Sequence, residues 1–370
     1  MRFPGFEGQW VKHTLGETGE PYIGLTYSPA DVVPEGGVIV FRSSNIKDGE
    51  IDYCDIVRVN KRIKESLITR KDDLLICARN GSPKLIGKNT LLKENDANQT
   101  FGAFMLVYRS PDNHFIHQLL ATKRYYSQVS ENLGARINQI TTANIKDFEF
   151  FFPKDKDERD KISRFLDLID QRIAIQNKVI ERYQSLIRAL YRKMMPNGDV
   201  EAVSLGRLVK VCKGKQVNGV LLSDTGPYYV MNGGITPSGY YDTFNTPPGT
   251  ISISEGGNSC GYVQFNDDPF WSGGHCYTLL EPNTAIVNYK YLFYYLKSLQ
   301  DKIMALRIGS GLPNIQKKDL EKFPLLLPSL ERQAQLAEVF EGLCHVEENE
   351  TDYQDLLCKQ KQFLLASVLI

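Results

Sequence analysis

The sequence lacks the features that would assign the chain to a membrane or to a secretory route. It contains no run of about 18 or more apolar residues, the length that a membrane-spanning helix needs. Its opening segment, MRFPGFEGQW, has no apolar core of the kind found in signal peptides. Its seven cysteines are odd in number, irregularly spaced and without a CxxC pair, which predicts reduced thiols. We therefore expect a soluble cytoplasmic protein without a disulfide framework.

The common catalytic and cofactor-binding motifs are also missing. There is no GxxxxGKS/T phosphate loop, no GxGxxG after a strand, no HExxH and no GxSxG. The tetrapeptide NTPP at 245–248 has the composition of the Asn-Pro-Pro-aromatic tetrad of adenine methyltransferases, but its order is wrong and no aromatic residue follows. Cys260, His275 and Cys276 lack a fourth ligand and regular spacing, which favours core and loop roles over a metal site. The pattern predicts a non-catalytic chain that holds no metal or cofactor of its own.

The chain has no net charge, but its charges are not evenly spread. It has 370 residues, enough for two domains, and 44 basic against 44 acidic groups. Residues 58–93 hold ten basic and three acidic residues. Such a local excess is typical of a surface that follows nucleic-acid phosphates, although a solvated lysine-rich face has the same composition.

An internal repeat is the main organising feature. Segments 137–153 and 312–328 match at an offset of 175 residues. The matched pairs are Ile137 with Leu312, Ile140 with Ile315, Ile145 with Leu320, Phe148 with Phe323, and Pro153 with Pro328. Upstream, Leu15-Gly16 resembles Leu205-Gly206, and a helical stretch follows each copy. The order of globular region, helix, globular region and helix predicts a domain duplication with pseudo-twofold character.

Two long helices are predicted from heptad spacing. The first runs from about Asp157 to Met195 and ends at Pro196-Asn197-Gly198, and the second runs from about Ser329, with a break expected near 347–351. The apolar seams predict the helix-pairing residues Ile162, Phe165, Ile169, Val179, Tyr183, Leu186, Leu190, Leu336, Val339, Leu343, Leu357 and Leu364. Ile173, Ile180 and Ile187 lie on a neighbouring track.

Opposite charge favours pairing of these two helices with each other. Residues 154–199 hold eleven basic and eight acidic groups, and residues 329–370 hold three and eight. Complementary charge beside apolar seams stabilises a coiled coil. The alternative is that each helix only covers its own domain.

The two globular halves are predicted to be α+β domains with many loops. Short apolar runs separated by glycine-rich turns indicate strands in both halves. Residues 114–129 and 290–306 are predicted to be helical.

Polar loops between predicted strands are the candidate DNA-binding sites. Arginine and asparagine can read guanine and adenine edges, and lysine can hold phosphates. The candidates in the first half are Arg79, Asn80, Ser82, Lys84, Lys88 and Asn89. Those in the second half are Lys213, Lys215, Asn232, Ser254, Glu255, Asn258 and Ser259. An ordinary turn has the same composition, but the corresponding strand–loop–strand setting in both halves favours a shared role.

With these features the chain resembles the specificity subunits of type I restriction-modification enzymes over essentially its whole length. The segments that carry the resemblance are Arg2 to Phe6 with Trp10 and Leu15-Gly16-Glu17, Pro153 to Met195 with Glu158-Arg159 and Asp170-Gln171-Arg172-Ile173, and Ser329-Leu330-Glu331-Arg332-Gln333. RNGSPKLIGKN, ISEGGNSCGYV and FWSGGHCY resemble variants of target-recognition segments.

The resemblance implies a fold and a mechanism. The expected fold is two target-recognition domains joined by two long helices that form an antiparallel coiled coil. The expected boundaries are 1–153 and 199–328 for these domains, and 154–198 and 329–370 for the helices. Each domain would read one half of a bipartite site in double-stranded DNA, while the helices set the spacer and dock two methyltransferase subunits. S-adenosylmethionine, ATP and Mg are expected on partner subunits, of which two restriction subunits are optional.

Other functions remain open at this point. The chain could be the specificity subunit of a methylation-only or type II-like system. It could also be a protein-interaction scaffold whose coiled coil joins two domains that bind no DNA. An enzyme that acts alone is the least favoured hypothesis.

Overall fold

The computed structural model describes residues 2–133, 138–193, 202–309, 311 and 313–369. The chain divides into a first unit, Met1–Lys178 with Asp352–Ile370, and a second unit, Val179–Thr351. Both units combine a globular part with segments of two long helices. Within the described ranges, no helix is long and apolar enough to span a lipid bilayer. All seven cysteines are free thiols.

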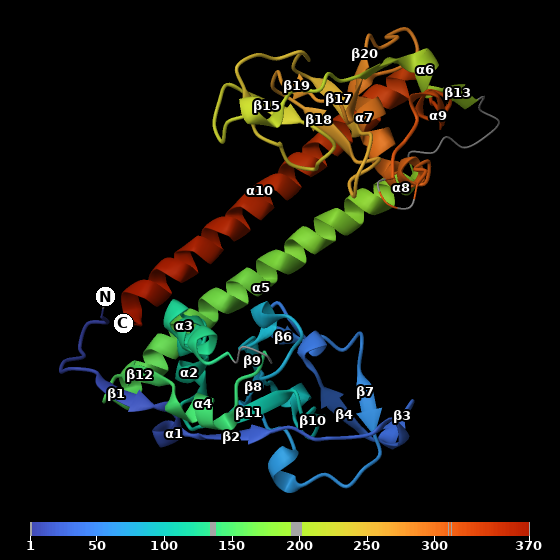
Figure 1. Cartoon of the computed structure of the whole chain (residues 1–370). Helices are drawn as coiled ribbons and strands as arrows, with labels where there is room; N and C mark the ends of the chain where they lie inside the picture. Colours follow the sequence, from blue (N-terminus) through green and yellow to red (C-terminus); the bar gives the residue numbers. More distant parts are fainter. Residues whose placement is uncertain (1, 134–137, 194–201, 310, 312, 370) are drawn as a thin grey trace. The chain divides into compact units, whose positions relative to one another are not determined.

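A four-stranded antiparallel sheet lies at the centre of the first unit. Its order is β2-β11-β8-β9, formed by β2 (Glu20–Ile23), β8 (Leu74–Cys77), β9 (Asn89–Leu91) and β11 (Met105–Arg109). All of β8 is buried because the sheet is covered on both faces, which explains its unbroken apolar run. One apolar core joins the sheet to the helices α2 (Asn113–Leu119), α3 (Lys123–Glu131) and α4 (Thr142–Asp147) (Figure 1).

Smaller sheets complete the first unit. One has the order β10-β4-β7-β3 and is formed by β3 (Val32–Val33), β4 (Val38–Phe41), β7 (Val57–Val59) and β10 (Thr100–Phe101). Two further pairs are β1 (Val11–Thr14) with β12 (Glu149–Phe152), and β5 (Ile46–Lys47) with β6 (Glu50–Ile51). The short helix α1 (Leu15–Thr18) follows β1.

The second unit repeats this architecture. Its central sheet has the order β14-β20-β17-β18, formed by β14 (Lys210–Lys213), β17 (Thr250–Ser254), β18 (Val263–Asn266) and β20 (Cys276–Leu280). The other strands are β13 (Ala202–Ser204) paired with β21 (Pro324–Leu326), and the sheet β16 (Tyr240–Tyr241), β15 (Tyr228–Met231) and β19 (Trp271–Ser272). The helices are α6 (Leu205–Leu208), α7 (Tyr289–Ser298), α8 (Gln300–Met304) and α9 (Lys317–Glu321).

The repeated Leu-Gly pair has a structural reason. The amide of Leu15 donates to the carbonyl of Phe148 at 2.9 Å, and Leu205 donates to Phe323 at the same distance. A Cβ atom on the next residue, a glycine in both copies, would lie 3.1 Å from the carbonyl oxygen of Lys146 or 3.2 Å from that of Glu321. The small residue lets α1 approach α4, and α6 approach α9, so closely.

A second repeated contact fixes the start of each long helix. The guanidinium of Arg159 donates to the Pro153 carbonyl at 2.7 Å and to Asp112 at 3.0 Å. At the matching place, the amide of Gln333 donates to the Pro328 carbonyl at 2.9 Å and accepts the Asn288 amide at 2.8 Å. Different side chains therefore make the same connection in both copies, which confirms the duplication predicted from the sequence.

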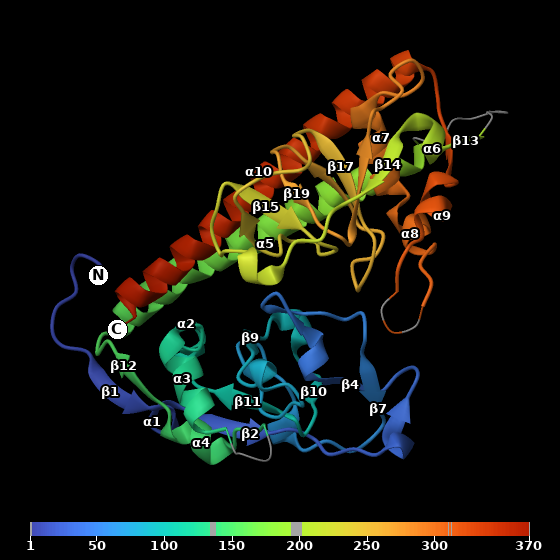
Figure 2. The ribbon, with the colours of Figure 1, turned by 45° about the horizontal axis from the view of Figure 1, so that its top comes forward.

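The two long helices are α5 (Lys156–Lys193) and α10 (Leu330–Val368). In the first unit they lie side by side in both views (Figures 1 and 2), with Lys361 paired to Asp170 and Gln354 bonded to Asn177. Residue numbers rise along one helix and fall along the other, so the pair is antiparallel, as predicted. In the second unit the ring of Tyr191 on α5 stacks on that of Phe340 on α10 at 4.8 Å.

The buried track of the pair differs in part from the predicted seam. Ile162 and Leu357 are buried. The half-buried members of the predicted seam are Ile169, Val179, Tyr183, Leu190, Leu336, Leu343 and Leu364. Phe165, Leu186 and Val339 are exposed at 36%, 45% and 50%. Their places are taken by the buried side chains of Leu166, Ile180, Ile187, Ala337 and Phe340. Heptad spacing predicts an apolar face, but several adjacent tracks on these helices are apolar and packing decides among them.

Three predicted helix boundaries are corrected. The helix predicted over 114–129 is two helices, α2 and α3, because Thr122 caps the second one by accepting the Tyr125 amide. The helix predicted over 290–306 is likewise divided into α7 and α8. The break expected near 347–351 is absent, and the Thr351 hydroxyl donates to the Glu347 carbonyl at 2.8 Å within continuous helix. The predicted stop at Pro196-Asn197-Gly198, the end at Met195, and the pair Ile137 and Leu312 lie outside the described residues.

Candidate nucleic-acid interface

Both candidate loops follow equivalent strands. The first loop leaves the buried strand β8 and leads to β9, and the second leaves β17 and leads to β18. In each sheet these two strands are neighbours at the same end of the strand order. The corresponding setting that the sequence predicts for the two loops is therefore present in the fold.

The backbone around the two loops is also the same. Ala78 donates to the Phe104 carbonyl at 2.9 Å, and Glu255 donates to the His275 carbonyl at 2.9 Å. The carbonyls of Ala78 and Glu255 accept the amides of Ile140 and Ile315, again at 2.9 Å. Single β-bridges join Arg79 to Gln139 and Gly256 to Asn314. Each loop thus lies on a rigid frame made by segments far apart in the sequence.

In the first loop, Arg79 and Lys84 present exposed side chains, whereas Asn80 and Ser82 are half-buried. The Arg79 guanidinium lies over the exposed Phe104 ring, 5.0 Å from its centroid. The Asn80 amide nitrogen donates to the Ser43 hydroxyl at 3.0 Å, and its oxygen accepts the Ser82 amide at 3.0 Å. Lys84 is exposed, and among the described residues it has no hydrogen-bond or ion-pair partner. Arg79 and Lys84 are the cations here that are available to an external anion.

Lys88 and Asn89, also predicted from this loop, are used within the domain. The Lys88 ammonium donates to the Ile46 carbonyl, and the Asn89 amide donates to the Gly87 carbonyl at 2.9 Å. Both side chains are half-buried. Their donors are satisfied by main-chain acceptors, so they support the loop from below.

In the second loop, Glu255 is the centre of a polar network. Its side chain is only 9% exposed and lies 2.6 Å from the Lys213 ammonium and 3.3 Å from Nδ1 of His275. The Tyr277 hydroxyl donates to the same carboxylate at 3.2 Å. Burial raises the pKa of the Tyr277 phenol, which therefore remains a donor. The network holds Lys213 and His275, which are 51% and 62% exposed, at the surface above a buried carboxylate.

The other predicted residues of the second unit fall into two groups. Ser254 is buried and donates to the Gly233 carbonyl at 2.8 Å, and the Asn232 side chain accepts the His275 amide at 3.1 Å, so both support the frame. Asn258 and Lys215 are exposed, and Ser259 is half-buried. The Lys215 amide donates to the Ser272 carbonyl at 2.8 Å, next to the turn that carries His275. Asn258 and Lys215 are therefore accessible at the surface, whereas Ser254 and Asn232 are used within the frame.

One residue of each loop frame, Phe104 in the first unit and His275 in the second, was missed by sequence reasoning. Phe104 is 57% exposed at the end of an otherwise buried apolar segment, and a hollow of about 720 Å³ lies beside it. The hollow is lined by Leu25, Tyr27, Val32, Val57, Met105, Arg42, Ser43 and Ser44 among others. His275 was considered only as a metal ligand. Neither residue has a sequence signal, because their neighbours come from strands far along the chain.

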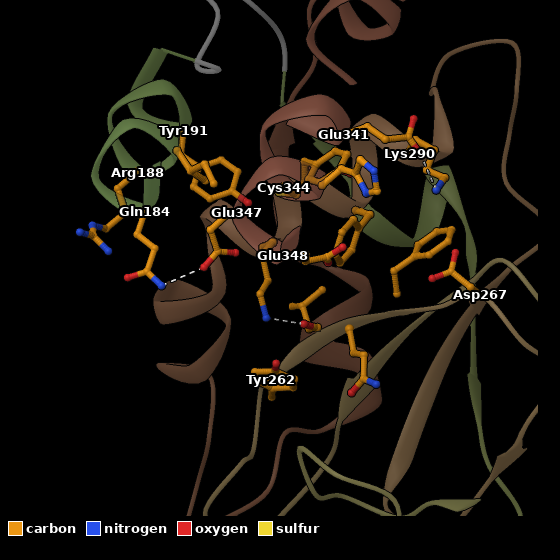
Figure 3. A pocket seen from close by; sticks show the side chains of 18 residues that line it. Gln184, Arg188, Tyr191, Tyr262, Asp267, Lys290, Glu341, Cys344, Glu347 and Glu348 are labelled. Atoms are coloured by element: carbon orange, nitrogen blue, oxygen red, sulfur yellow. Dashed lines mark hydrogen bonds and ion pairs between the residues drawn. The ribbon is translucent and has the colours of Figure 1, made fainter. Parts of the chain in front are cut away.

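A second cavity, of about 660 Å³, lies within the second unit against both long helices (Figure 3). Asp267, Glu341, Glu347 and Glu348 contribute four carboxylates to its wall. Three of these groups come from α10. Arg188, Lys290 and Lys297 also line the cavity, and Lys290 pairs with Glu341 at 3.0 Å, so the lining has mixed charge and gives no reason to place DNA there.

The comparison with known families agrees with the duplication. The model of the type I restriction modification DNA specificity domain matches residues 8–182 and again 197–354. These two matches cover most of the chain. They correspond to the two globular halves together with long-helix segments.

Individual relatives are similar over part or all of the chain. A type I specificity subunit of Mycoplasma pneumoniae is 36% identical over 146 residues, 39% of this chain and 39% of the relative. One of Mycoplasma genitalium is 36% identical over 122 residues, 33% of this chain and 32% of the relative. The matched segments thus span about two fifths or less of these curated relatives.

Solved structures share the fold of the whole chain. The crystal structure of the S subunit of a type I restriction-modification system from M. genitalium matches with a TM-score of 0.71 and 19% identity, covering 100% of this chain and 99% of that one. A chain from a structural study of assembly and conformational transition of the type I system matches with a TM-score of 0.54 and 16% identity, covering 99% and 98%. The duplicated loop frame, the antiparallel long helices and the two family matches lead to one conclusion: the chain belongs to the family of type I restriction modification DNA specificity domains, and it carries two copies of that domain.

Proposed function

We propose that the chain is the sequence-specific DNA-recognition subunit of a type I restriction-modification complex. Each unit reads one half of a bipartite site in double-stranded DNA. The observation that carries this proposal is the repeated loop frame, in which identical backbone hydrogen bonds present different side chains in the two copies. A shared backbone support with different surface residues is what two readers of different sequences require.

The chemistry of the complex belongs to partner subunits in this proposal. Two methyltransferase subunits bind S-adenosylmethionine and methylate adenine, and optional restriction subunits use ATP and Mg. The chain itself is non-catalytic and contributes recognition and geometry. Family membership supports this division of labour.

The paired helices have two roles in the proposal: they set the spacer between the half-sites, and they dock the methyltransferases. Exposed apolar side chains that repeat every seven residues support docking. In the first unit these are Leu168 and Ile175 on α5, at 58% and 62% exposure, and Leu356 and Phe363 on α10, at 60% and 64%. Helix faces of this kind pack against helices of a partner.

The test of the proposed function replaces the two available cations of the first loop. We expect Arg79→Ala combined with Lys84→Ala to abolish adenine methylation by the complex while leaving subunit assembly intact, because the changes remove surface donors without touching the core. Methylated adenines are mapped in cells that produce this chain with its methyltransferase partner, and assembly is measured by size-exclusion chromatography.

The matched control is Lys93→Ala. Lys93 belongs to the same basic stretch but is paired with Glu50 at 2.6 Å, so its loss is expected to leave methylation unchanged. Wild-type methylation in the double variant would remove the first loop from the interface. Absence of any bipartite motif with the wild-type complex would refute the proposed function.

A further inference from the structure

The two loop frames contain four matched positions that differ in chemical character. Strand register places Leu106 opposite Ile23 in the first unit and Tyr277 opposite Lys213 in the second. The shared amide-to-carbonyl bond matches Ala78 with Glu255 and Phe104 with His275. The first set is therefore Ile23, Ala78, Phe104 and Leu106, and the second set is Lys213, Glu255, His275 and Tyr277.

Every member of the first set is apolar, and every member of the second is polar. In the first set, Ala78 and Leu106 are buried, whereas Ile23 and Phe104 are 47% and 57% exposed. In the second set, the buried pair is Glu255 with Tyr277, and the exposed pair is Lys213 with His275. In each set, the two buried residues therefore have the same apolar or polar character as the two exposed residues. A merely structural difference would not require the two exposed positions to change class together with the buried ones.

The exposed members suit different base edges. An apolar side chain such as Phe104 contacts the 5-methyl group of thymine, the only apolar group in the major groove. Arg79 lies over the Phe104 ring, and a hollow lies beside the same ring. The ammonium of Lys213 instead suits the N7 and O6 acceptors of guanine. A buried carboxylate holds Lys213 and His275 at the surface of the second unit.

Building on the proposed function, we propose that these four matched positions set a base preference in each half-site. Phe104 and Ile23 take the 5-methyl group of a thymine in the half-site of the first unit. Lys213 donates to the acceptor edge of a guanine in the half-site of the second unit, next to the His275 ring with which it shares Glu255. Glu255 is a positioning residue that holds Lys213 and His275.

The test uses chemically altered duplexes that carry the mapped motif, bound by the complex of this chain with its methyltransferase partner. Replacing one thymine of the first half-site by deoxyuridine removes only the methyl group and is expected to weaken wild-type binding about four-fold. The Phe104→Ala complex is expected to lose this sensitivity. Replacing one guanine of the other half-site by 7-deazaguanine is expected to weaken wild-type binding about ten-fold, and His275→Phe with Lys213→Ile to abolish that difference.

Matched controls come from the same elements. Lys210 lies at the other end of β14 and pairs with Glu281, and Tyr126 is an exposed aromatic residue on α3. Lys210→Ile and Tyr126→Ala are expected to keep both sensitivities. Glu255→Gln is expected to lose the 7-deazaguanine sensitivity and to retain the deoxyuridine sensitivity, a split that general loss of structure would not produce. If the Glu255 variant does not assemble, the exposed substitution Lys213→Ile alone decides.

Two results would overturn the inference. One is that Phe104→Ala and the His275 and Lys213 variant keep the wild-type preferences in both half-sites. The other is that either variant alters both half-sites together. If the wild-type complex recognises no bipartite motif, the proposed function fails instead, so the two failures are distinguishable.

Discussion

At the residue scale, the basic stretch at 58–93 illustrates what charge counting leaves out. Lys61 is paired with Asp31 at 3.3 Å, Lys93 with Glu50 at 2.6 Å, and Lys88 is bonded to a carbonyl. Part of the local positive charge is therefore neutralised by acids from other parts of the fold. Fewer cations are available to DNA than the sequence indicates, so Arg79 and Lys84 become the main candidates for contact with DNA in this stretch.

A histidine in the first unit gives a prediction on pH. Nδ1 of His114 lies 3.1 Å from Asp167 on α5, and Nε2 lies 3.1 Å from Asp72. The hydrogen bond to Asp167 raises the pKa of His114 against the opposing effect of burial. The folded pKa thus exceeds the unfolded value of about 6.5, so this contribution is fully present below that pH and is lost as pH rises through the folded pKa.

We therefore expect His114→Gln to lower the denaturation midpoint of the first unit more at pH 6 than at pH 8.5. The measurement is urea denaturation of the full chain at both values, followed by hydrogen exchange of α2. His117, on the same helix, has its pKa lowered by burial and interacts electrostatically with His114, so the single variant His117→Gln is measured beside it as a reference. If the variant lowers the denaturation midpoint equally at the two pH values, the ion pairs of His114 contribute nothing to stability.

The candidate loops could be predicted from the sequence, but the hydrogen bonds and ion pairs among their side chains could not. Arg79, Asn80 and Lys84 were found because they are polar residues in one short turn between apolar runs. The network around Glu255 joins residues 42, 20 and 22 positions away. Only the pairing of β14, β17 and β20 brings these groups together, and one sequence does not specify that pairing.

At the element scale, the long helices separate what periodicity can and cannot predict. Their existence, approximate start and pairing follow from the heptads and the opposite charges, and their antiparallel direction follows from the family resemblance. The inward track does not follow, because a helix that also packs on its own domain needs a wider apolar face than a two-helix seam. Phe340 shows this, since it contacts Tyr191 on α5 and Tyr294 on α7.

Neighbouring residues on α10 test which track is buried. Phe340 is fully buried, so we expect Phe340→Ala to lower the free energy of unfolding by about 3–5 kcal/mol through lost burial and a residual cavity. Val339, the predicted seam residue, is 50% exposed, so Val339→Ala is expected to change it by less than about 0.5 kcal/mol. The free energy of unfolding of both variants is measured by equilibrium denaturation. Similar losses of stability in the two variants would show that Val339 lies in the buried seam, as the heptads predict.

At the scale of the whole molecule, the C-terminal end of the last helix packs into the core of the first unit. The last turn of α10, with Leu365 and Val368, and the following residue Leu369 belong to the same apolar core as β8 and α2 of the first unit. The duplication was visible in the sequence, but this packing was not, because the C-terminal helix carries no mark of which half it completes.

This packing predicts that a destabilising substitution near the C-terminus weakens the N-terminal half of the chain first. Leu365 is 2% exposed, and Leu365→Ala is expected to cost about 3 kcal/mol. Hydrogen exchange should accelerate in α2 and β8 while the strands of the second unit keep wild-type protection. Equal acceleration in both units would contradict the assignment of this segment to the first core.

Zero net charge predicts how the molecule binds DNA as a whole. Without a long-range positive field, attraction to DNA depends on a few local cations, and each phosphate contact contributes about 0.9 to the slope of log affinity against log salt. Lys84 is exposed and has no ion-pair partner among the described residues, so Lys84→Ala should reduce this slope by about 0.9 on both specific and unrelated duplexes. Arg79→Ala should instead weaken binding mainly to the specific duplex, because a base contact carries the sequence preference.

Fluorescence anisotropy titrations from 50 to 200 mM salt, chosen around the physiological range of about 150 mM, separate the two effects. An unchanged slope for Lys84→Ala would mean that the first loop does not contact phosphate.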